Sequence, residues 1–280
     1  MFNLQQFQVS FRTRLWWCAT GPLAFLPIHA AGIYSEDAKQ GSSLPTVAVS
    51  SYTPTVSSLV DRAHEKYDGS HRFLLVSQPN TPGLTAIPGT RREARALAEM
   101  LQKESFQTVH LDSKEATLDN VKRELMQHSW VHLACHAVQD TTSPLRSGFH
   151  LQDGLLDLSE IMKQQIPNAD FAFLSACQTS TGDEKLSEEA VHLAAGMLAA
   201  GYRGVVSTMW SIKDKYGPDV AENFYSYLCA QRAKMGEGEV GLYGAGAAYA
   251  LDFATRHIRE KVKDSEEGLL TWVPYVHFGQ

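Results

Sequence analysis

The chain is poor in cysteine, with only four in 280 residues. Cys18, Cys135, Cys177 and Cys229 are widely spaced, and no two of them form a CxxC pair. Few and scattered cysteines exclude a disulfide framework and are typical of a reducing compartment. We therefore expect an intracellular protein.

Positive charge and long apolar runs are also scarce. Lys and Arg total 25 against 31 Asp and Glu, which gives a net charge of −6 and a pI near 6.0. Nucleic-acid binding needs a basic surface, so we expect no such partner. The apolar stretch from Leu15 to Ala31 imitates a signal sequence, but Gly21, Pro22 and Pro27 interrupt it. A spanning helix needs roughly 20 predominantly apolar residues, so we expect no membrane segment.

Several catalytic motifs are missing as well. The chain has no HExxH zinc motif, no GxSxG elbow of the α/β-hydrolases and no P-loop. The glycine-rich segment "GLYGAGAAYA" follows no strand and lacks the lysine and serine that bind phosphates, so close helix packing explains its small residues. We expect neither a cofactor nor a bound metal.

One group of metal-ligand residue types still needs weighing. His132, Cys135, His136 and Cys177 could in principle bind zinc. Side chains alternate between the faces of a strand, so Cys135 should point away from the side that His132 and His136 share. The strand pattern therefore disfavours a zinc site.

Strand-like and helix-like segments alternate from residue 72 onward. Apolar runs such as "RFLLVSQP", "WVHLACH" and "FAFLSAC" are separated by amphipathic segments such as "REARALAEMLQKES". Strands that are apolar on both faces predict a mostly parallel sheet with helices on both sides, that is, a doubly wound α/β fold. We expect one domain over residues 1–280: an apolar N-terminal segment at 1–34, a surface connection at 35–71 with a short strand at 46–50, and the α/β core at 72–280.

Two strands of this core end in reactive side chains. His136 follows "VHLAC", and Cys177 closes "FAFLSAC". In open α/β sheets the ligand site lies beyond the carboxyl ends of the strands, where these two side chains would meet. A thiol attacks as its thiolate and needs a nearby base, so the pair indicates thiol catalysis. His132, inside its strand, is more plausibly a structural core histidine.

These segments resemble a known family. "HLACHA", "FLSACQTSTGD", "EAVHLAAGMLAAGYRGVVSTMWSIKD" and "VPYVHFG" look like the CHAT domain, a caspase-like peptidase family often fused to tetratricopeptide repeats, and most like its fungal branch. The resemblance covers nearly the whole chain. It implies a caspase-hemoglobinase fold and a catalytic dyad of His136 and Cys177.

The resemblance also implies roles for other residues. The backbone N–H groups of Cys177 and Ala137 would form the oxyanion hole, although the family usually has glycine at the second position. Alanine still offers its N–H if the backbone can adopt the required angles. Trp210, Ser211 and Asp214 would contact the substrate, with Trp210 about equally well explained as a core aromatic.

The implied function is a cysteine endopeptidase that acts on a protein substrate through a thioester intermediate. A sensor or tetratricopeptide-repeat partner would control it. Two alternatives stay open: a catalytically silent interaction or scaffold module with the same fold, and another thiol-dependent acyl-transfer enzyme.

Overall fold

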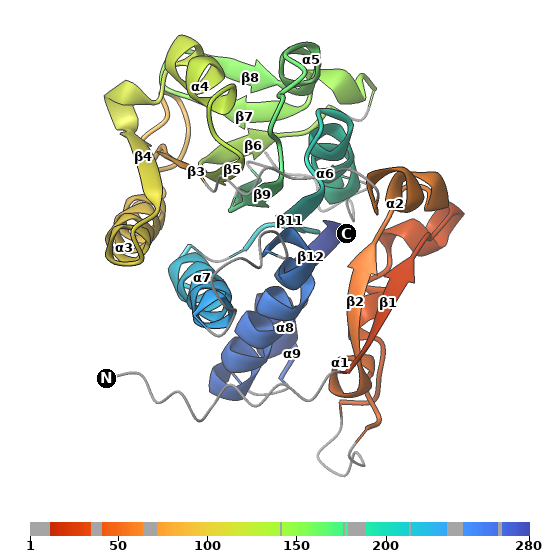
Figure 1. Cartoon of the computed structure of the whole chain (residues 1–280). Helices are drawn as coiled ribbons and strands as arrows, with labels where there is room; N and C mark the ends of the chain where they lie inside the picture. The colour runs from red at the N-terminus through yellow and green to blue at the C-terminus, as the bar shows by residue number, and fades with distance from the viewer. Residues whose placement is uncertain are drawn as a thin grey trace.

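The computed structural model describes residues 12–34, 41–63, 72–140, 142–175, 177–178, 189–212, 214–233, 243–262 and 265–280. Its centre is an eight-stranded sheet (Figure 1). In spatial order the strands are β1 (Thr13–Trp17), β2 (Ala48–Tyr52), β12 (Tyr275–Gly279), β11 (Gly204–Thr208), β9 (Phe171–Leu174), β5 (Trp130–Ala134), β3 (Arg72–Ser77) and β4 (Gln107–Asp112).

The main sheet consists of two blocks of parallel strands. β1, β2 and β12 run in one direction, whereas β11, β9, β5, β3 and β4 run in the other, with the antiparallel contact between β12 and β11. The inner strands β5, β9, β11 and β12 are buried along their whole length. This burial explains why their sequences are continuous apolar runs.

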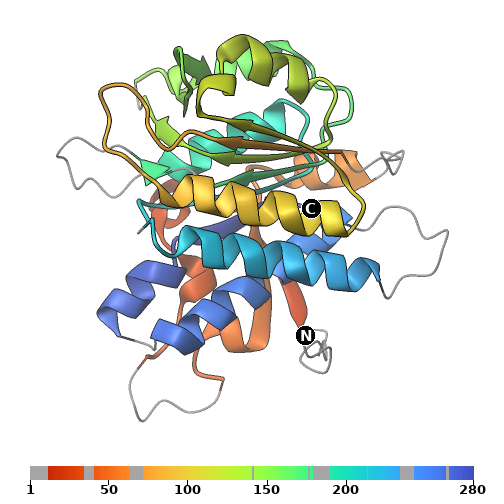
Figure 2. The same cartoon turned by 90° about the vertical axis from the view of Figure 1, so that its left-hand side faces the viewer.

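Helices cover both faces, as the apolar strands predict. One face packs on α4 (Leu118–Leu125), α5 (Leu158–Lys163) and α6 (Glu189–Ala199). The other packs on α3 (Gly89–Lys103), α7 (Gly217–Arg232), α8 (Tyr243–Val262) and α9 (Glu266–Trp272). Figure 2 shows α3 in yellow and α7 in cyan running side by side beneath the sheet. The predicted doubly wound architecture is confirmed.

A second, four-stranded sheet lies beyond the ends of β5 and β9 (Figure 1). Its order is β10 (Cys177–Gln178), β6 (His136–Val138), β7 (Gly148–His150) and β8 (Leu155–Asp157). The chain bends at Cys135 between β5 and β6. The residues after β5 are therefore part of a small second sheet.

The segment expected to be a surface connection contributes to the main sheet. It contains α1 (Leu44–Val47), β2 and α2 (Val56–Ala63), and β2 begins two residues after the strand expected at 46–50. A chain of side-chain hydrogen bonds crosses three strands here: Arg14 donates to Ser51 Oγ, which is itself hydrogen-bonded to Nδ1 of His277, 2.9 Å away. The N-terminal strands are thus joined to the C-terminal one through buried polar contacts.

The apolar stretch from Leu15 to Ala31 forms β1 and two 3₁₀ turns, η2 (Gly21–Phe25) and η3 (Ile28–Ala30). His29 joins η3 to its neighbours by two hydrogen bonds. Its Nδ1 lies 2.9 Å from the Tyr52 hydroxyl of β2, and its Nε2 lies 2.8 Å from the carbonyl of Val273. Burial lowers the pKa of His29 to about 4. Within the described ranges, no helix combines the length and the apolar character needed to cross a bilayer.

The remaining turns are η4 (Ser113–Glu115) and η5 (Pro144–Arg146). The C-terminal segment consists of α9 followed by β12. Ser265 begins α9 by accepting a hydrogen bond from the N–H of Gly268, which is the usual role of a serine at a helix N-cap.

Asp170 precedes β9 and makes stability depend on pH. It is buried, accepts a hydrogen bond from Trp130 Nε1 at 2.8 Å, and burial raises its pKa to about 6. A carboxyl group with a raised folded-state pKa stabilises the fold below about pH 4, and this contribution is lost as the pH rises through 6. At pH 8 the loss amounts to about 3 kcal/mol at most.

Asp170→Asn keeps an oxygen for Trp130 but carries no charge. We expect the difference in free energy of unfolding between this variant and the wild type to shift in favour of the variant from pH 4.5 to pH 8. Urea denaturation of both proteins at both pH values measures it. A difference between the two proteins that is independent of pH would contradict this assignment.

Candidate active site

His136 and Cys177 face each other across two adjacent parallel strands. In the main sheet Leu133 pairs with Leu174, 41 positions later, and in the small sheet His136 pairs with Cys177, again 41 positions later. The two strands therefore bend together without losing register. Neighbouring strands lie about 4.8 Å apart, so the backbones of the two residues are adjacent. The side chain of Cys177 lies outside the described part of the structure.

The imidazole of His136 is oriented by a backbone carbonyl. Its Nε2 lies 2.7 Å from the oxygen of Thr85, in the segment between β3 and α3. A carbonyl only accepts, so Nε2 carries the proton and Nδ1 has the lone pair of the neutral ring. Nδ1 is buried and has no hydrogen-bond partner among the described residues. His136 therefore presents Nδ1 as its basic nitrogen.

Thr85 was not among the residues singled out from the sequence. Its side chain is exposed, and the interaction with His136 uses only the backbone oxygen. The segment around it is held by Ile87, which is buried and whose N–H donates to the carbonyl of Pro79 at 2.9 Å. No residue type is required for a carbonyl contact, so the sequence carries no signal for it.

Ala137 has unstrained extended backbone. It lies in β6 opposite Phe149 of β7 and Gln178 of β10, and its φ is not positive. An alanine in this conformation meets no clash from its Cβ, so its N–H is retained where the family usually has glycine.

The predicted substrate residues lie in the segment between β11 and α7. Trp210 is half-buried and packs against the hydrophobic cores on both faces of the sheet, which supports its reading as a core aromatic. Ser211 is exposed. Asp214 is half-buried, and its Oδ2 accepts a hydrogen bond from the N–H of Gly89 at 2.8 Å.

His132 is a structural residue, as its place inside a strand indicates. It is buried, with Nε2 2.8 Å from Glu93 Oε1 and Nδ1 3.3 Å from the Tyr225 hydroxyl. Its ring stacks on Phe173. Cys135 belongs to the core on the opposite face of the sheet. Cys135 and His132, two of the residues weighed as zinc ligands, thus lie on opposite faces of the sheet.

His150 of β7 lies close to the dyad. Burial lowers the pKa of His150, and the positive charge of a protonated His136 lowers it further.

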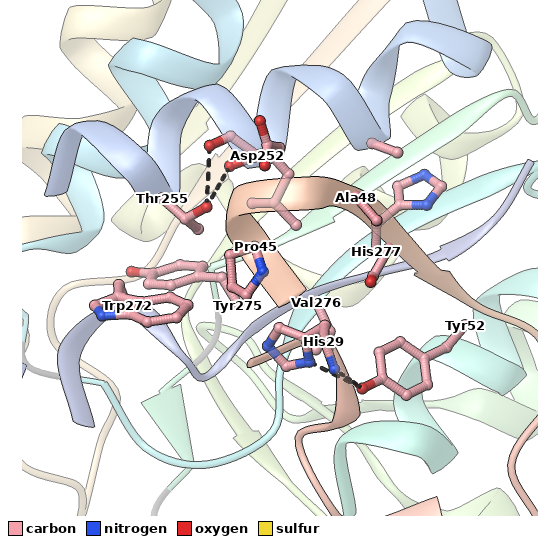
Figure 3. A pocket seen from close by; sticks show the side chains of 13 residues that line it. His29, Pro45, Ala48, Tyr52, Asp252, Thr255, Trp272, Tyr275, Val276 and His277 are labelled. Carbon is pink, nitrogen blue, oxygen red and sulfur yellow. Dashed lines mark hydrogen bonds between the residues drawn. The ribbon is translucent and has the colours of Figure 1, made fainter. Parts of the chain in front are cut away.

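A separate cavity lies between β2, β12 and α8 (Figure 3). Its walls include Tyr52, Asp252 and Trp272, and none of its lining residues comes from the strands that carry His136 and Cys177. Its volume of about 40 Å³ holds about three water molecules. This cavity cannot receive a peptide.

Solved structures similar to this chain include cysteine proteases of the caspase-hemoglobinase fold. Gingipain R, described as an Arg-specific cysteine proteinase, has 13% identity and a TM-score of 0.56, with 84% of this chain and 55% of that one covered. The complex of the Porphyromonas gingivalis RgpB pro- and mature domains has 12% identity and a TM-score of 0.56, with 99% and 67% covered. The Saccharomyces cerevisiae separase–securin complex has 14% identity and a TM-score of 0.54, with 92% and 14% covered. The chain has the caspase-like fold.

The chain belongs to the CHAT domain family, whose profile matches residues 3–280. A search of the curated proteins found no match. The chain spans about half the length of gingipain R and a seventh of the separase chain. The family assignment from the sequence motifs is confirmed.

Proposed function

We propose that the protein is a cysteine endopeptidase that uses Cys177 as nucleophile and His136 as general base and acid. The observation that carries this proposal is the register that pairs His136 directly with Cys177, together with the Thr85 carbonyl that leaves Nδ1 of His136 as the basic nitrogen. Membership of the CHAT family and the caspase-like fold support it.

The reaction proceeds in two halves. In the first, His136 takes the proton of the Cys177 thiol, the thiolate forms a C–S bond to the scissile carbonyl, and the C–N bond breaks as the imidazolium protonates the leaving amine. In the second, His136 takes a proton from water, the hydroxide attacks the thioester, and the thiolate leaves. The N–H groups of Cys177 and Ala137 stabilise the oxyanion in both halves.

The substrate is a protein segment bound in extended form beside the β11–α7 connection. Ser211 is exposed there and Trp210 is half-buried, so both can contact the residues before the scissile bond. Gingipain R is described as Arg-specific. Arginine is therefore the first residue to test before the scissile bond of this protein's substrates.

A catalytically silent interaction module is the second candidate. His136 is only 3% exposed, so the leaving amine of a peptide does not reach its imidazole in this conformation. A closed site of this kind fits either a protease that opens on activation or a fold kept for binding alone.

The proposal is tested with a peptidyl chloromethyl ketone that carries arginine next to the warhead, followed by a panel with other residues there. We expect covalent labelling of Cys177, located by mass spectrometry of the digested protein, and cleavage of matching peptides. Cys177→Ala should lose both. Cys135, which is buried, serves as the internal control thiol. If neither the arginine probe nor the panel labels Cys177 in any activated state of the protein, the protein is a silent module.

A further inference from the structure

Asp214 caps a helix that is far from it in sequence. Its Oδ2 accepts the N–H of Gly89, the first residue of α3 and 125 positions away. The N-cap residue of α3 is Pro88, which makes no side-chain cap. The first N–H groups of a helix need external acceptors, and a carboxylate is favoured at the positive end of the helix dipole. Asp214 supplies the hydrogen-bond acceptor and the negative charge that Pro88, directly before α3, does not provide.

Two more contacts fix the β11–α7 connection on the start of α3. Arg92 donates to the carbonyl of Lys215 at 3.2 Å. Gly217, the first residue of α7, packs so closely on Glu93 that a Cβ at this glycine would lie 3.0 Å from Glu93 Oε2. The C-terminal end of the β11–α7 connection, which also contains Trp210 and Ser211, is therefore attached to the start of α3.

The chain immediately before α3 orients the predicted catalytic histidine. Thr85, whose carbonyl accepts the Nε2 proton of His136 at 2.7 Å, is four residues before Gly89. Ile87, which lies between them, is fixed to the first turn of α3, because the N–H and the hydroxyl of Thr90 both donate to its carbonyl. A displacement of Gly89 is thus transmitted over a short, hydrogen-bonded stretch to the carbonyl that holds His136.

We propose that Asp214 is a positioning residue for His136, acting through Gly89 and the Thr85 carbonyl, rather than a residue that binds the substrate side chain. The inference rests on the proposed function of the dyad and deepens it. The hydrogen bond between Gly89 and Asp214 then has two effects. It holds the β11–α7 connection at the start of α3, and it fixes the position of His136, the base that activates Cys177.

A reagent without a peptide side chain separates the two roles of Asp214. Iodoacetamide reacts with the Cys177 thiolate to form a C–S bond and release iodide, and it offers nothing for a specificity pocket to bind. We would measure its rate at Cys177 by mass spectrometry across pH, with exposed Cys18 as the reference thiol. An activated dyad keeps the rate high at about pH 6.5, where an ordinary thiol is protonated.

Asp214→Ala is expected to lower the Cys177 rate about tenfold at pH 6.5, because a misplaced base no longer stabilises the thiolate. At about pH 9.5 the thiolate forms without help, and the rate should stay within about twofold of the wild type. Asp214→Asn still accepts the Gly89 N–H and should retain most of the rate. Gly89→Ala should reproduce the loss, since a Cβ there would lie 2.5 Å from Asp214 Oδ1.

Asp219→Asn is the matched control. It removes a carboxylate from the first turn of α7 that pairs with Lys261 of α8 at 3.0 Å. It should leave the pH profile unchanged. Thermal unfolding of each variant identifies any general loss of structure, which would change the rate at both pH values.

The outcomes are distinct. If wild-type Cys177 shows the pH profile of an ordinary thiol, the proposed dyad fails and the role of Asp214 fails with it. If the wild type is activated and Asp214→Ala keeps the full rate at pH 6.5, the dyad stands and the positioning role is overturned.

Discussion

His136→Ala is expected to lower peptide hydrolysis about a thousandfold, because positioned acid–base catalysis contributes about 10² to 10⁴ in rate. The residual activity should rise steeply with pH, since only the fraction of Cys177 that ionises unaided can attack. Rates of cleavage of a fluorogenic peptide, measured from pH 5 to pH 9.5, test both expectations. A variant that retains the wild-type profile would exclude His136 as the base.

His150→Gln provides the comparison for this experiment. His150 lies in β7, next to the strand that carries His136, and is half-buried. It has no role in the proposed reaction, so cleavage should stay near the wild-type rate. A large loss with His150→Gln would instead indicate that the local sheet structure, and not the imidazole of His136, controls the rate.

Glu93→Ala should cause the largest loss of stability, about 3–5 kcal/mol in the free energy of unfolding. Glu93 and His132 are 2% and 1% exposed, and their hydrogen bond joins α3 to the centre of the main sheet. Removing the carboxylate leaves the Nε2 proton of a buried imidazole without an acceptor. Urea denaturation monitored by circular dichroism measures the loss.

Two further variants make this test specific. Glu99→Ala removes an exposed carboxylate from the same helix and should change stability by less than about 0.5 kcal/mol. The double variant Glu93→Ala, His132→Ala should cost less than the sum of the two single variants, because each single change leaves a buried partner unsatisfied. Strict additivity would show that the two side chains are not coupled.

The sequence predicts the inner part of this fold well and its periphery less well. β5, β9 and β11 are buried on both faces, so their apolar runs identify them directly. β1, at the edge of the sheet, contains only exposed and half-buried residues and begins with two polar ones. The strands of the small sheet have two or three residues each, too short for a hydrophobic period to develop.

The candidate site is likewise only partly predictable from the sequence. His136 and Cys177 are predictable because each is a reactive side chain at the end of a recognisable strand. The Thr85 carbonyl is not, because any residue supplies one. The link from Asp214 to Gly89 spans 125 positions and depends on how α3 packs beside α7, which no local pattern records.

The place of β2 in the sheet has a consequence for synthesis of the protein. β2 pairs only with β1 and β12 in the described sheet, and its partner Phe278 lies 226 positions after Tyr52. At roughly 5–20 residues per second, the ribosome takes about 10 to 45 seconds to cover this distance. During that time β1 and β2 are out of the tunnel but have no edge on which to dock. The contact between β2 and β12 therefore forms last, and a nascent chain that stops before β12 leaves β1 and β2 without their partner strand.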